Sequence, residues 1–265
     1  METPDGRDAP TAPPTLLPVH ERVALIADVH GNAPALTAVL DEARADGVDA
    51  LVFLGCLTWG PEPTRVIELA QSTGRPTYFL RGNGERAVLE LAAGTRDAAS
   101  PTDSWMVNAH GPAGVQFLAA LPTGLIGQVA GIGRIRLCHG SPRSDIELLT
   151  PGTPPERIAA ACADVTESTI AHGHTHLQYT RLAGQRRVIG VGSVGLPYGG
   201  DEPGARWTVV GPTIEPRRTA YDIDEAIAAA DAVNYPGLER YTGTLRQPPT
   251  LQMIIDDAES KGYSD

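Results

Sequence analysis

Residues 22–47, RVALIADVHGNAPALTAVLDEARADG, contain a short apolar run, a loop and a periodic segment in immediate succession. The apolar run ends at Asp28 and leads into a loop that contains Gly31. From Ala33, apolar residues recur at the spacing of an amphipathic helix until Gly47 ends the pattern. We therefore predict a strand, a loop and a helix here, which is the beginning of a β-α-β unit.

The same order occurs again in the following residues. Strands are predicted at residues 50–55 (ALVFLG) and 76–82 (PTYFLRG), and helices at residues 63–74 and 85–94. Such alternation is typical of parallel strands joined by helical crossovers. Ligand sites in these sheets lie beyond the carboxyl ends of the strands, so the loops after the strands are where chemistry is expected.

The second half of the chain is richer in strands. A mainly helical segment at residues 101–121 interrupts the alternation, and a helix is predicted at residues 154–165. The tail returns to helix at residues 222–233 and 236–245. Short strands with glycine-containing turns are predicted in the stretches RIRLCHG, TIAHGHTH, LQYTRLAG, QRRVIGVGSVG and ARWTVVG. These elements predict an α/β protein in which two packed sheets have helices outside them.

The domain organisation is predicted to be simple. A chain of 265 residues can bury one sizeable core. Residues 1–18 are rich in proline and have no periodicity, so they are predicted to form a disordered tail. Residues 19–265 are predicted to form a single domain that ends in a helical tail.

Charge and composition indicate which kinds of binding partner and which cellular location to expect. The net charge of −11 gives a surface field that repels nucleic-acid polymers and anionic membranes, so a small-molecule ligand is favoured. No run approaches the roughly 18 apolar residues of a membrane span, and no secretory signal is recognisable. Three cysteines make no disulfide framework, which favours a reducing, cytoplasmic location. Assembly into a homo-oligomer is left open.

Metal-ligating residue types gather in loops that follow predicted strands. A single histidine at a strand end is more often a hydrogen-bonded structural residue than a ligand. Together, however, these loops place imidazole and carboxylate donors at one end of a sheet, where divalent metals can be bound. The loops are DVHGN with Asp28 and His30, RGNGE with Asn83 and Glu85, CHGSP with His139, and GHTH with His174 and His176.

The order of these blocks, together with LGCLTWGPEP at residues 54–63, resembles the calcineurin-like metallophosphoesterase superfamily. The stretch VGSVGLP at residues 191–197 and the helical tail look most like its small bacterial phosphodiesterase branch. The resemblance implies a four-layer αββα sandwich of two mixed β-sheets flanked by helices. It also implies hydrolysis of a small phosphodiester or phosphorylated metabolite by a metal-bound hydroxide.

The resemblance implies two divalent metal ions, which would be zinc, iron or manganese. One ion would be bound by Asp28, His30 and His176, and Cys56 would lie between the two ions. The second ion would be bound by the side chains of Asn83, His139 and His174.

Cys56 departs from the family pattern, which has a bridging aspartate at this position. Three interpretations are open. The thiolate could bridge both ions, since zinc–sulfur bonds of about 2.3 Å partly offset the shorter side chain, and softer metals would then be favoured. Alternatively, Cys56 does not ligate and the protein is a metal-binding sensor or interaction module with reduced hydrolysis. Under the third interpretation, the site performs non-phosphate chemistry.

Gly84 is the second departure, because many family members have a histidine there that can protonate the leaving oxygen. Glycine has no proton to give, so His110 is a candidate acid from elsewhere, with His172 as another. Asn83, and Asn32 in DVHGN, are candidate catalytic or substrate hydrogen-bonding groups. Each of these residues also has a structural interpretation as a buried or loop hydrogen-bonding group.

Substrate-binding residues are predicted from their positions beside the ligand loops. Arg81 and Arg143 could each form a bidentate contact with a phosphate, although a solvated surface role is the alternative. Trp59 could stack on a ring of the substrate or pack its own loop against the core.

Overall fold

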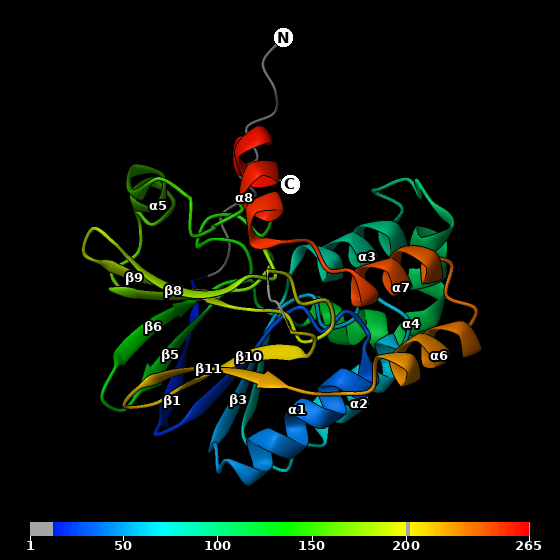
Figure 1. Cartoon of the computed structure of the whole chain (residues 1–265), viewed down its shortest axis with the longest axis horizontal. Helices are drawn as coiled ribbons and strands as arrows, with labels where there is room; N and C mark the ends of the chain where they lie inside the picture. Colours follow the sequence, from blue (N-terminus) through cyan, green and yellow to red (C-terminus); the bar gives the residue numbers. More distant parts are fainter. Residues whose placement is uncertain (1–12, 200–201, 265) are drawn as a thin grey trace.

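The computed structural model describes residues 13–199 and 202–264, which form two mixed β-sheets flanked by helices (Figure 1). This arrangement confirms the predicted fold class. The five-stranded sheet has the order β11-β10-β2-β3-β4. Its strands are β2 (Val23–Ile26), β3 (Ala50–Leu54), β4 (Thr77–Leu80), β10 (Ala205–Val210) and β11 (Ile214–Thr219).

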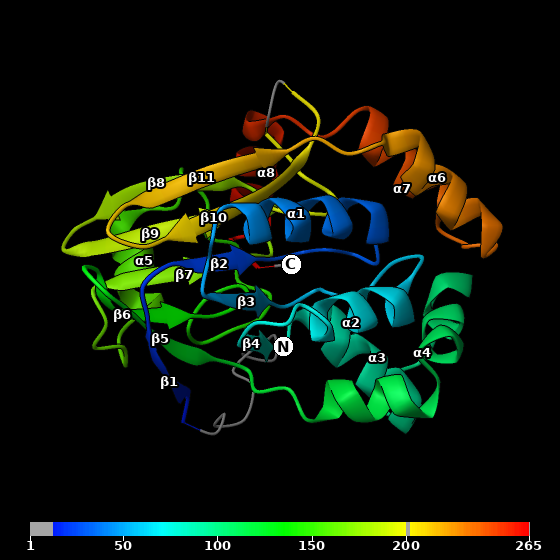
Figure 2. The ribbon, with the colours of Figure 1, turned by 90° about the horizontal axis from the view of Figure 1, so that it is seen from below.

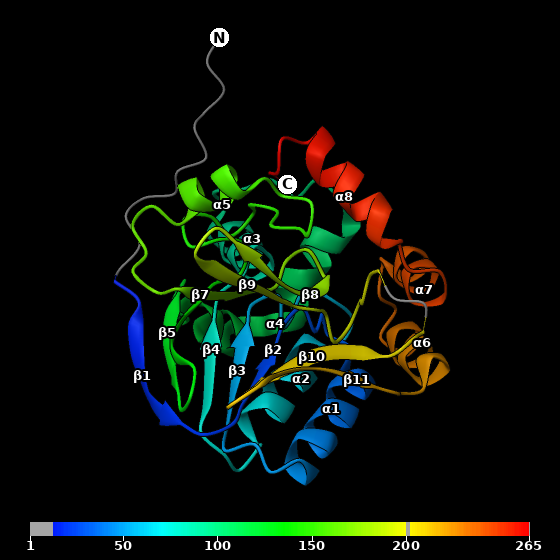
Figure 3. The same cartoon turned by 60° about the vertical axis from the view of Figure 1, so that its left-hand side comes forward.

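In the five-stranded sheet, β2, β3 and β4 are parallel neighbours, as the strand–helix alternation predicts (Figure 3). The strand β10 then adds antiparallel to β2, and β11 pairs with β10 as a hairpin. All residues of β2 and β3 are buried, which explains why they read as continuous apolar runs rather than as alternating patterns.

The second sheet has six strands in the order β1-β5-β6-β7-β9-β8. Here β6, β7 and β9 are parallel, whereas β5 pairs antiparallel with β6, and β8 pairs antiparallel with β9. The strands are β1 (Thr15–His20), β5 (Leu125–Val129), β6 (Gly133–Leu137), β7 (Thr169–His172), β8 (Gln178–Ala183) and β9 (Arg186–Val191).

The described residues contain eight helices. They are α1 (Ala33–Ala45), α2 (Pro63–Gln71), α3 (Asn83–Ala93), α4 (Pro101–Ala119), α5 (Pro155–Ala161), α6 (Ile223–Ala232), α7 (Leu238–Arg246) and α8 (Leu251–Ser260). Helices α1 and α2 pack on the five-stranded sheet and α5 packs on the six-stranded one. Figure 2 shows α3 and α4 beyond the ends toward which β2 and β3 point.

The core between the two sheets is apolar. Leu25, Val52 and Leu80 of the first sheet pack against residues of the second sheet that include Leu137 and Val191. All five side chains are at most 3% exposed. This packing holds the carboxyl ends of strands from both sheets next to each other, which is the condition for a shared site.

The structure corrects the predicted boundary of the N-terminal tail. Residues 15–18 belong to β1, which pairs parallel with β5 at the edge of the six-stranded sheet. Pro18 weakens the strand signal in the sequence, because proline has no N–H to donate to a neighbouring strand. Proline is nevertheless tolerated in a strand at the edge of a sheet. The pairing register shifts between Leu16 and Val19, around the proline. The predicted disorder of residues 1–12 lies outside the described residues.

Three further elements, β5, β11 and α8, were not predicted individually. The glycine in β5 and the proline in β11 weaken their strand signal, and both strands are supported by neighbours rather than by their own sequence. Helix α8 buries only Ala258, so it lacks a strong apolar stripe.

Candidate metal centre

The predicted ligand loops lie together at the carboxyl ends of their strands. Asp28 follows β2 and Cys56 follows β3, and the two loops are tied by the bond from Asp28 N to Gly55 O, 3.0 Å. His139 follows β6 and His174 follows β7, and a bond of 2.9 Å from Gly173 N to His139 O joins these loops. Because the two sheets face each other, the donors from both sheets share one site.

The backbone of these loops is unusual. The non-glycine residues with positive φ in the described chain are Asp28, His30, Cys56, His174, His176, Asn234 and Tyr263. The first five are all candidate ligands. A side chain in this left-handed region costs about 1–2 kcal/mol, and such strain persists where the surrounding structure enforces it. The concentration of strained backbone at the candidate ligands indicates a functional site.

Three histidine rings are held in the orientation that metal ligation requires. His30 Nδ1 donates to Trp59 O at 2.8 Å, and His176 Nδ1 donates to Leu196 O at 2.7 Å. His139 Nδ1 donates to Leu54 O at 2.7 Å. Since a carbonyl can only accept, each Nδ1 carries a proton, and when the ring is neutral its Nε2 presents a lone pair to the centre.

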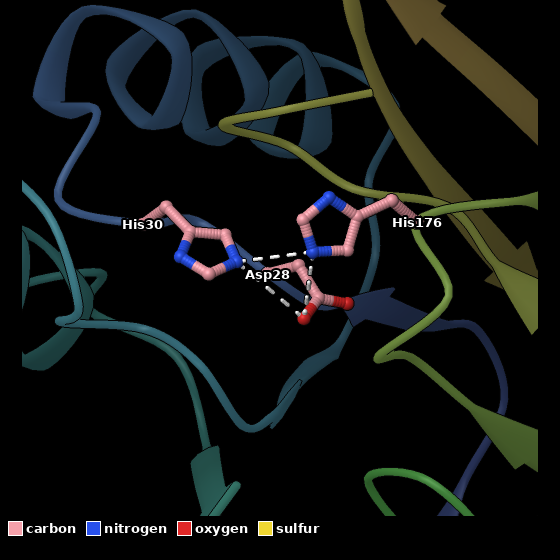
Figure 4. Close-up of side chains that lie close together, drawn as sticks. All are labelled: Asp28, His30 and His176. Carbon is pink, nitrogen blue, oxygen red and sulfur yellow. Dashed lines mark hydrogen bonds and ion pairs between the residues drawn. The ribbon is translucent and has the colours of Figure 1, made fainter. Parts of the chain in front are cut away.

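Lone pairs therefore face one another around Asp28 (Figure 4). The Nε2 atoms of His30 and His176 are 3.0 Å apart. Asp28 Oδ1 lies 3.5 Å from His176 Nε2 and 3.9 Å from His30 Nε2. This oxygen is fully buried and has no hydrogen-bond partner within the described chain. A buried acceptor surrounded by other acceptors fits a cation, because a cation is the partner that satisfies all of them.

A second group of donors lies beside the first. Cys56 Sγ is 3.2 Å from His139 Nε2 and 3.1 Å from Asn83 Oδ1. His139 Nε2 is also 2.8 Å from Asn83 Oδ1 and 3.9 Å from Asp28 Oδ1. His139 and Cys56 are both buried. Thiolate, imidazole and carboxylate donors at this spacing are a ligand set for zinc and similar ions.

Burial shifts the pKa values of these groups. Burial raises the pKa of the Cys56 thiol well above its ordinary value, and Glu85 and Asp28 add to the shift. Burial, with help from His176, lowers the pKa of His30 to about 4, so this ring is neutral at pH 7. Burial would raise the pKa of Asp28, but the rings of His176, His139 and His30 outweigh it and lower that pKa.

Glu85, which the sequence offered as a candidate metal ligand, organises the loops instead and belongs to neither candidate group of ligands among the described residues. Its fully buried carboxylate accepts bonds from Cys56 N at 2.8 Å, Gly82 N at 2.9 Å and Thr58 N at 3.1 Å. It thus holds the Cys56 loop and the first turn of α3 together. Its position three residues after Gly82 at the start of a helix is the signal that could have predicted this role.

The structure does not bring every predicted residue to the centre. Asn32 caps α1 by accepting from Ala35 N, and its amide donates to Gly195 O. His110 is buried in α4, where Nδ1 donates to Met106 O at 2.6 Å, and burial lowers its pKa. These bonds match the structural interpretation of both residues.

Of the other candidate residues, only Trp59 lies at the cavity. His172 is buried and bonds Tyr179 Oη at 2.9 Å. Arg143 pairs with Glu147, and neither Arg143 nor Arg81 lines the cavity described below. Trp59 does line it.

Trp59 stands beside Gly84, the position at which the family resemblance led us to expect a histidine. A Cβ atom on Gly84 would lie 3.0 Å from Trp59 Cβ and 3.1 Å from Cys56 Sγ. A histidine at position 84 would therefore need Trp59 to move. The tryptophan, rather than an acid, forms this wall of the site.

A cavity of about 830 Å³ opens onto the donors. Its far side is formed by residues after β11, which include Tyr235, Arg240, Tyr241, Ile254 and Lys261. Helices α7 and α8 therefore roof the centre. A pocket of this volume is the size that encloses a small organic molecule.

The fold and the site define an α/β protein with candidate ligand groups for divalent metals beyond its strand ends. The chain belongs to the calcineurin-like phosphoesterase superfamily, since the model of the calcineurin-like phosphoesterase superfamily domain matches residues 22–210. This finding confirms the resemblance drawn from the motifs. Helices α6, α7 and α8 lie beyond the matched residues.

Solved structures share the fold. A hypothetical protein, PH1004, from Pyrococcus horikoshii OT3 is similar with a TM-score of 0.69 and 21% identity, covering 86% of this chain and 97% of that one. A metallophosphoesterase from Sphaerobacter thermophilus is similar with a TM-score of 0.67 and 23% identity, covering 86% of this chain and 99% of that one. No curated protein matches the sequence. None of the described helices is long and apolar enough to cross a membrane.

Proposed function

We propose that this protein is a metal-dependent phosphoesterase that hydrolyses a small phosphodiester or phosphorylated metabolite. The observation that carries the proposal is the convergence of buried lone pairs. Asp28 Oδ1 has no hydrogen-bond partner in the described chain, and the His30 and His176 Nε2 atoms face each other at 3.0 Å beside it. Divalent cations are the groups that satisfy such a set of donors.

The ligand roles follow the two groups of donors. Asp28, His30 and His176 would hold one ion. A second ion would be held by the side chains of Cys56, Asn83, His139 and His174. Such ions supply a hydroxide near neutral pH and stabilise the charge of the phosphoryl group. Around them, the carbonyls of Trp59, Leu54 and Leu196 keep the rings in their ligating tautomer, and Glu85 keeps the two ligand loops in register.

A small substrate is supported by the cavity and the charge. About 830 Å³ encloses an organic phosphoester but not a folded partner or a duplex. The net charge of −11 disfavours nucleic-acid polymers. Arg240 lines the cavity and supplies local positive charge for an anionic substrate, whereas the charge of Lys261 is paired with Asp257 at 2.9 Å. Because Gly84 has no proton to donate, substrates with good leaving groups are favoured.

The proposal is tested by metal analysis and turnover on the same sample. Purified protein is assayed for bound metal by mass spectrometry and for hydrolysis of bis-p-nitrophenyl phosphate and p-nitrophenyl phosphate. We expect bound divalent metal and diester turnover, both lost in Asp28→Asn. Cys162→Ser changes a buried cysteine in the α5 cluster and serves as the control for general disruption. Metal-loaded protein without turnover of either ester would refute the hydrolase proposal.

A metal-binding module without hydrolysis is the second candidate, and Cys56 is the observation that favours it. The family has a bridging aspartate at this position, and its replacement can weaken the site. Under this alternative, Cys56→Asp would gain turnover that the natural chain lacks. If the natural chain is the faster of the two, the alternative is excluded.

A further inference from the structure

The two candidate metal groups share one residue, and it is not the cysteine. Asp28, His30 and His176 form one group whose ligand atoms all lie within 4.8 Å of one another. Asp28, Cys56 and His139 form the other. Among the described residues, no such group joins Cys56 to His30 or His176. The sulfur therefore lies on one side of the centre, and the carboxylate of Asp28 lies between the two sides.

The distances support the same division. Donors bound at about 2.0–2.3 Å to one zinc ion lie roughly 3–4 Å apart in a tetrahedral site. Cys56 Sγ meets this spacing with His139 Nε2 at 3.2 Å. Asp28 Oδ1 meets it on both sides, with 3.5 Å to His176 Nε2 and 3.9 Å to His139 Nε2.

We propose that Asp28 bridges the two metal ions and that Cys56 is a terminal thiolate ligand of only one of them. The proposal rests on the metal-binding part of the proposed function and does not depend on turnover. It differs from the bridging cysteine considered from the sequence. On binding, the Cys56 S–H bond breaks, a metal–sulfur bond forms, and the proton leaves to solvent.

The two sites then differ in their metal preference. The Cys56 site has a sulfur donor and buried ligands, with Cys56 3% and His139 1% exposed, so it selects zinc, cadmium or cobalt. The Asp28, His30 and His176 site has only nitrogen and oxygen donors, so it also accepts manganese. The centre is therefore built to hold two unlike ions.

Cobalt titration tests this directly, because a thiolate bound to Co²⁺ absorbs in the near ultraviolet. The full chain is freed of metal with a chelator and titrated with Co²⁺, while bound metal is counted by mass spectrometry. We expect the thiolate band to be complete at one equivalent and unchanged by the second. Cys56→Ser should lose the band and weaken one site by at least about tenfold, leaving the other within about threefold. Cys162→Ser should keep the band.

Two results would overturn the proposal. A band that grows through both equivalents would mean a bridging sulfur, and no band in the natural chain would mean that Cys56 does not ligate. Competition adds a second readout: with Zn²⁺ and Mn²⁺ both in excess, the natural chain should retain about one of each, whereas Cys56→Asp should gain manganese. Equal manganese content in the two chains would also contradict the proposal. An intact titration in a protein that lacks turnover would refute only the hydrolase function.

Discussion

At the scale of single residues, the site depends on a left-handed backbone conformation that residues other than glycine disfavour. Asp28, His30, Cys56, His174 and His176 all have positive φ. Each costs about 1–2 kcal/mol, so the loops need contacts that hold them in place. Glu85 provides the main contact between two of the loops, because its buried carboxylate satisfies three backbone N–H groups.

Removing the Glu85 carboxylate should cost both stability and metal affinity. Glu85→Ala leaves buried N–H groups of Cys56, Thr58 and Gly82 without an acceptor, so we expect a loss of about 2–4 kcal/mol in the free energy of unfolding. Metal affinity should fall about 10–100-fold, because the Cys56 loop is no longer held. Urea unfolding and metal titration measure the two effects.

Glu90 is the matched control on the same helix. It is partly exposed and pairs with Arg86 four residues before it. Glu90→Ala should change the free energy of unfolding by no more than about 0.5 kcal/mol and leave metal affinity unchanged. Equal losses in the two variants would show that Glu85 has no special role.

At the scale of elements, the parallel strands place the ligands and the C-terminal helices close the cavity over them. Helix α8 presents Ile254 and Asp257 to the cavity, and Lys261, which caps the helix, lies on the same face, four residues after Asp257. The helix buries only Ala258, so it contributes little to the core. Its role in the fold is to shape the cavity.

Filling the cavity from α8 should block the substrate without disturbing the metal centre. We expect Ile254→Trp to lower kcat/KM for a diester about tenfold and to leave metal content unchanged, because the larger ring occupies substrate space. Met253 is next to it, is 59% exposed and does not line the cavity, so Met253→Trp is the control. Steady-state kinetics that fall equally in both variants would contradict the assignment of this face to the cavity.

At the scale of the whole molecule, burial of neutral histidines makes stability depend on pH. Burial lowers the pKa of His172 from 6.5 to about 4, and that of His30 to about 4 as well. The unfolded chain therefore binds more protons than the folded chain between these pH values. The stability that each buried neutral ring contributes is on the order of 3 kcal/mol. This contribution is fully present above pH 6.5 and is lost as the pH falls toward 4.

Urea unfolding of the metal-free protein between pH 7 and pH 4 measures this loss. We expect His172→Gln, which keeps hydrogen-bonding capacity but does not titrate, to have a flatter profile by about one ring's contribution. If the two profiles have the same slope over this range, then His172 is not buried as a neutral ring.

The sequence by itself determined the class of fold, the order of most elements and the loops that could bind metal. It could do so because buried parallel strands are continuous apolar runs, amphipathic helices have a fixed period, and sites follow strand ends. It did not reveal β1 or β11, since each contains a proline and depends on a neighbouring strand for its pairing. It also offered Asn32 and His110 as catalytic residues, although Asn32 Oδ1 caps α1 and His110 Nδ1 donates to a carbonyl within α4.

Only the tertiary structure decided how the metal-ligating side chains are distributed between the two metal sites. Two sheets, whose strands are far apart in sequence, bring Asp28 between His176 and His139, while Cys56 lies with His139 on one side. Spacing along the chain cannot show this, because the distances between loops depend on how the sheets pack. The structure also shows the positive φ angles at Asp28 and Cys56, and it brings residues of α7 and α8 to the cavity beside the centre.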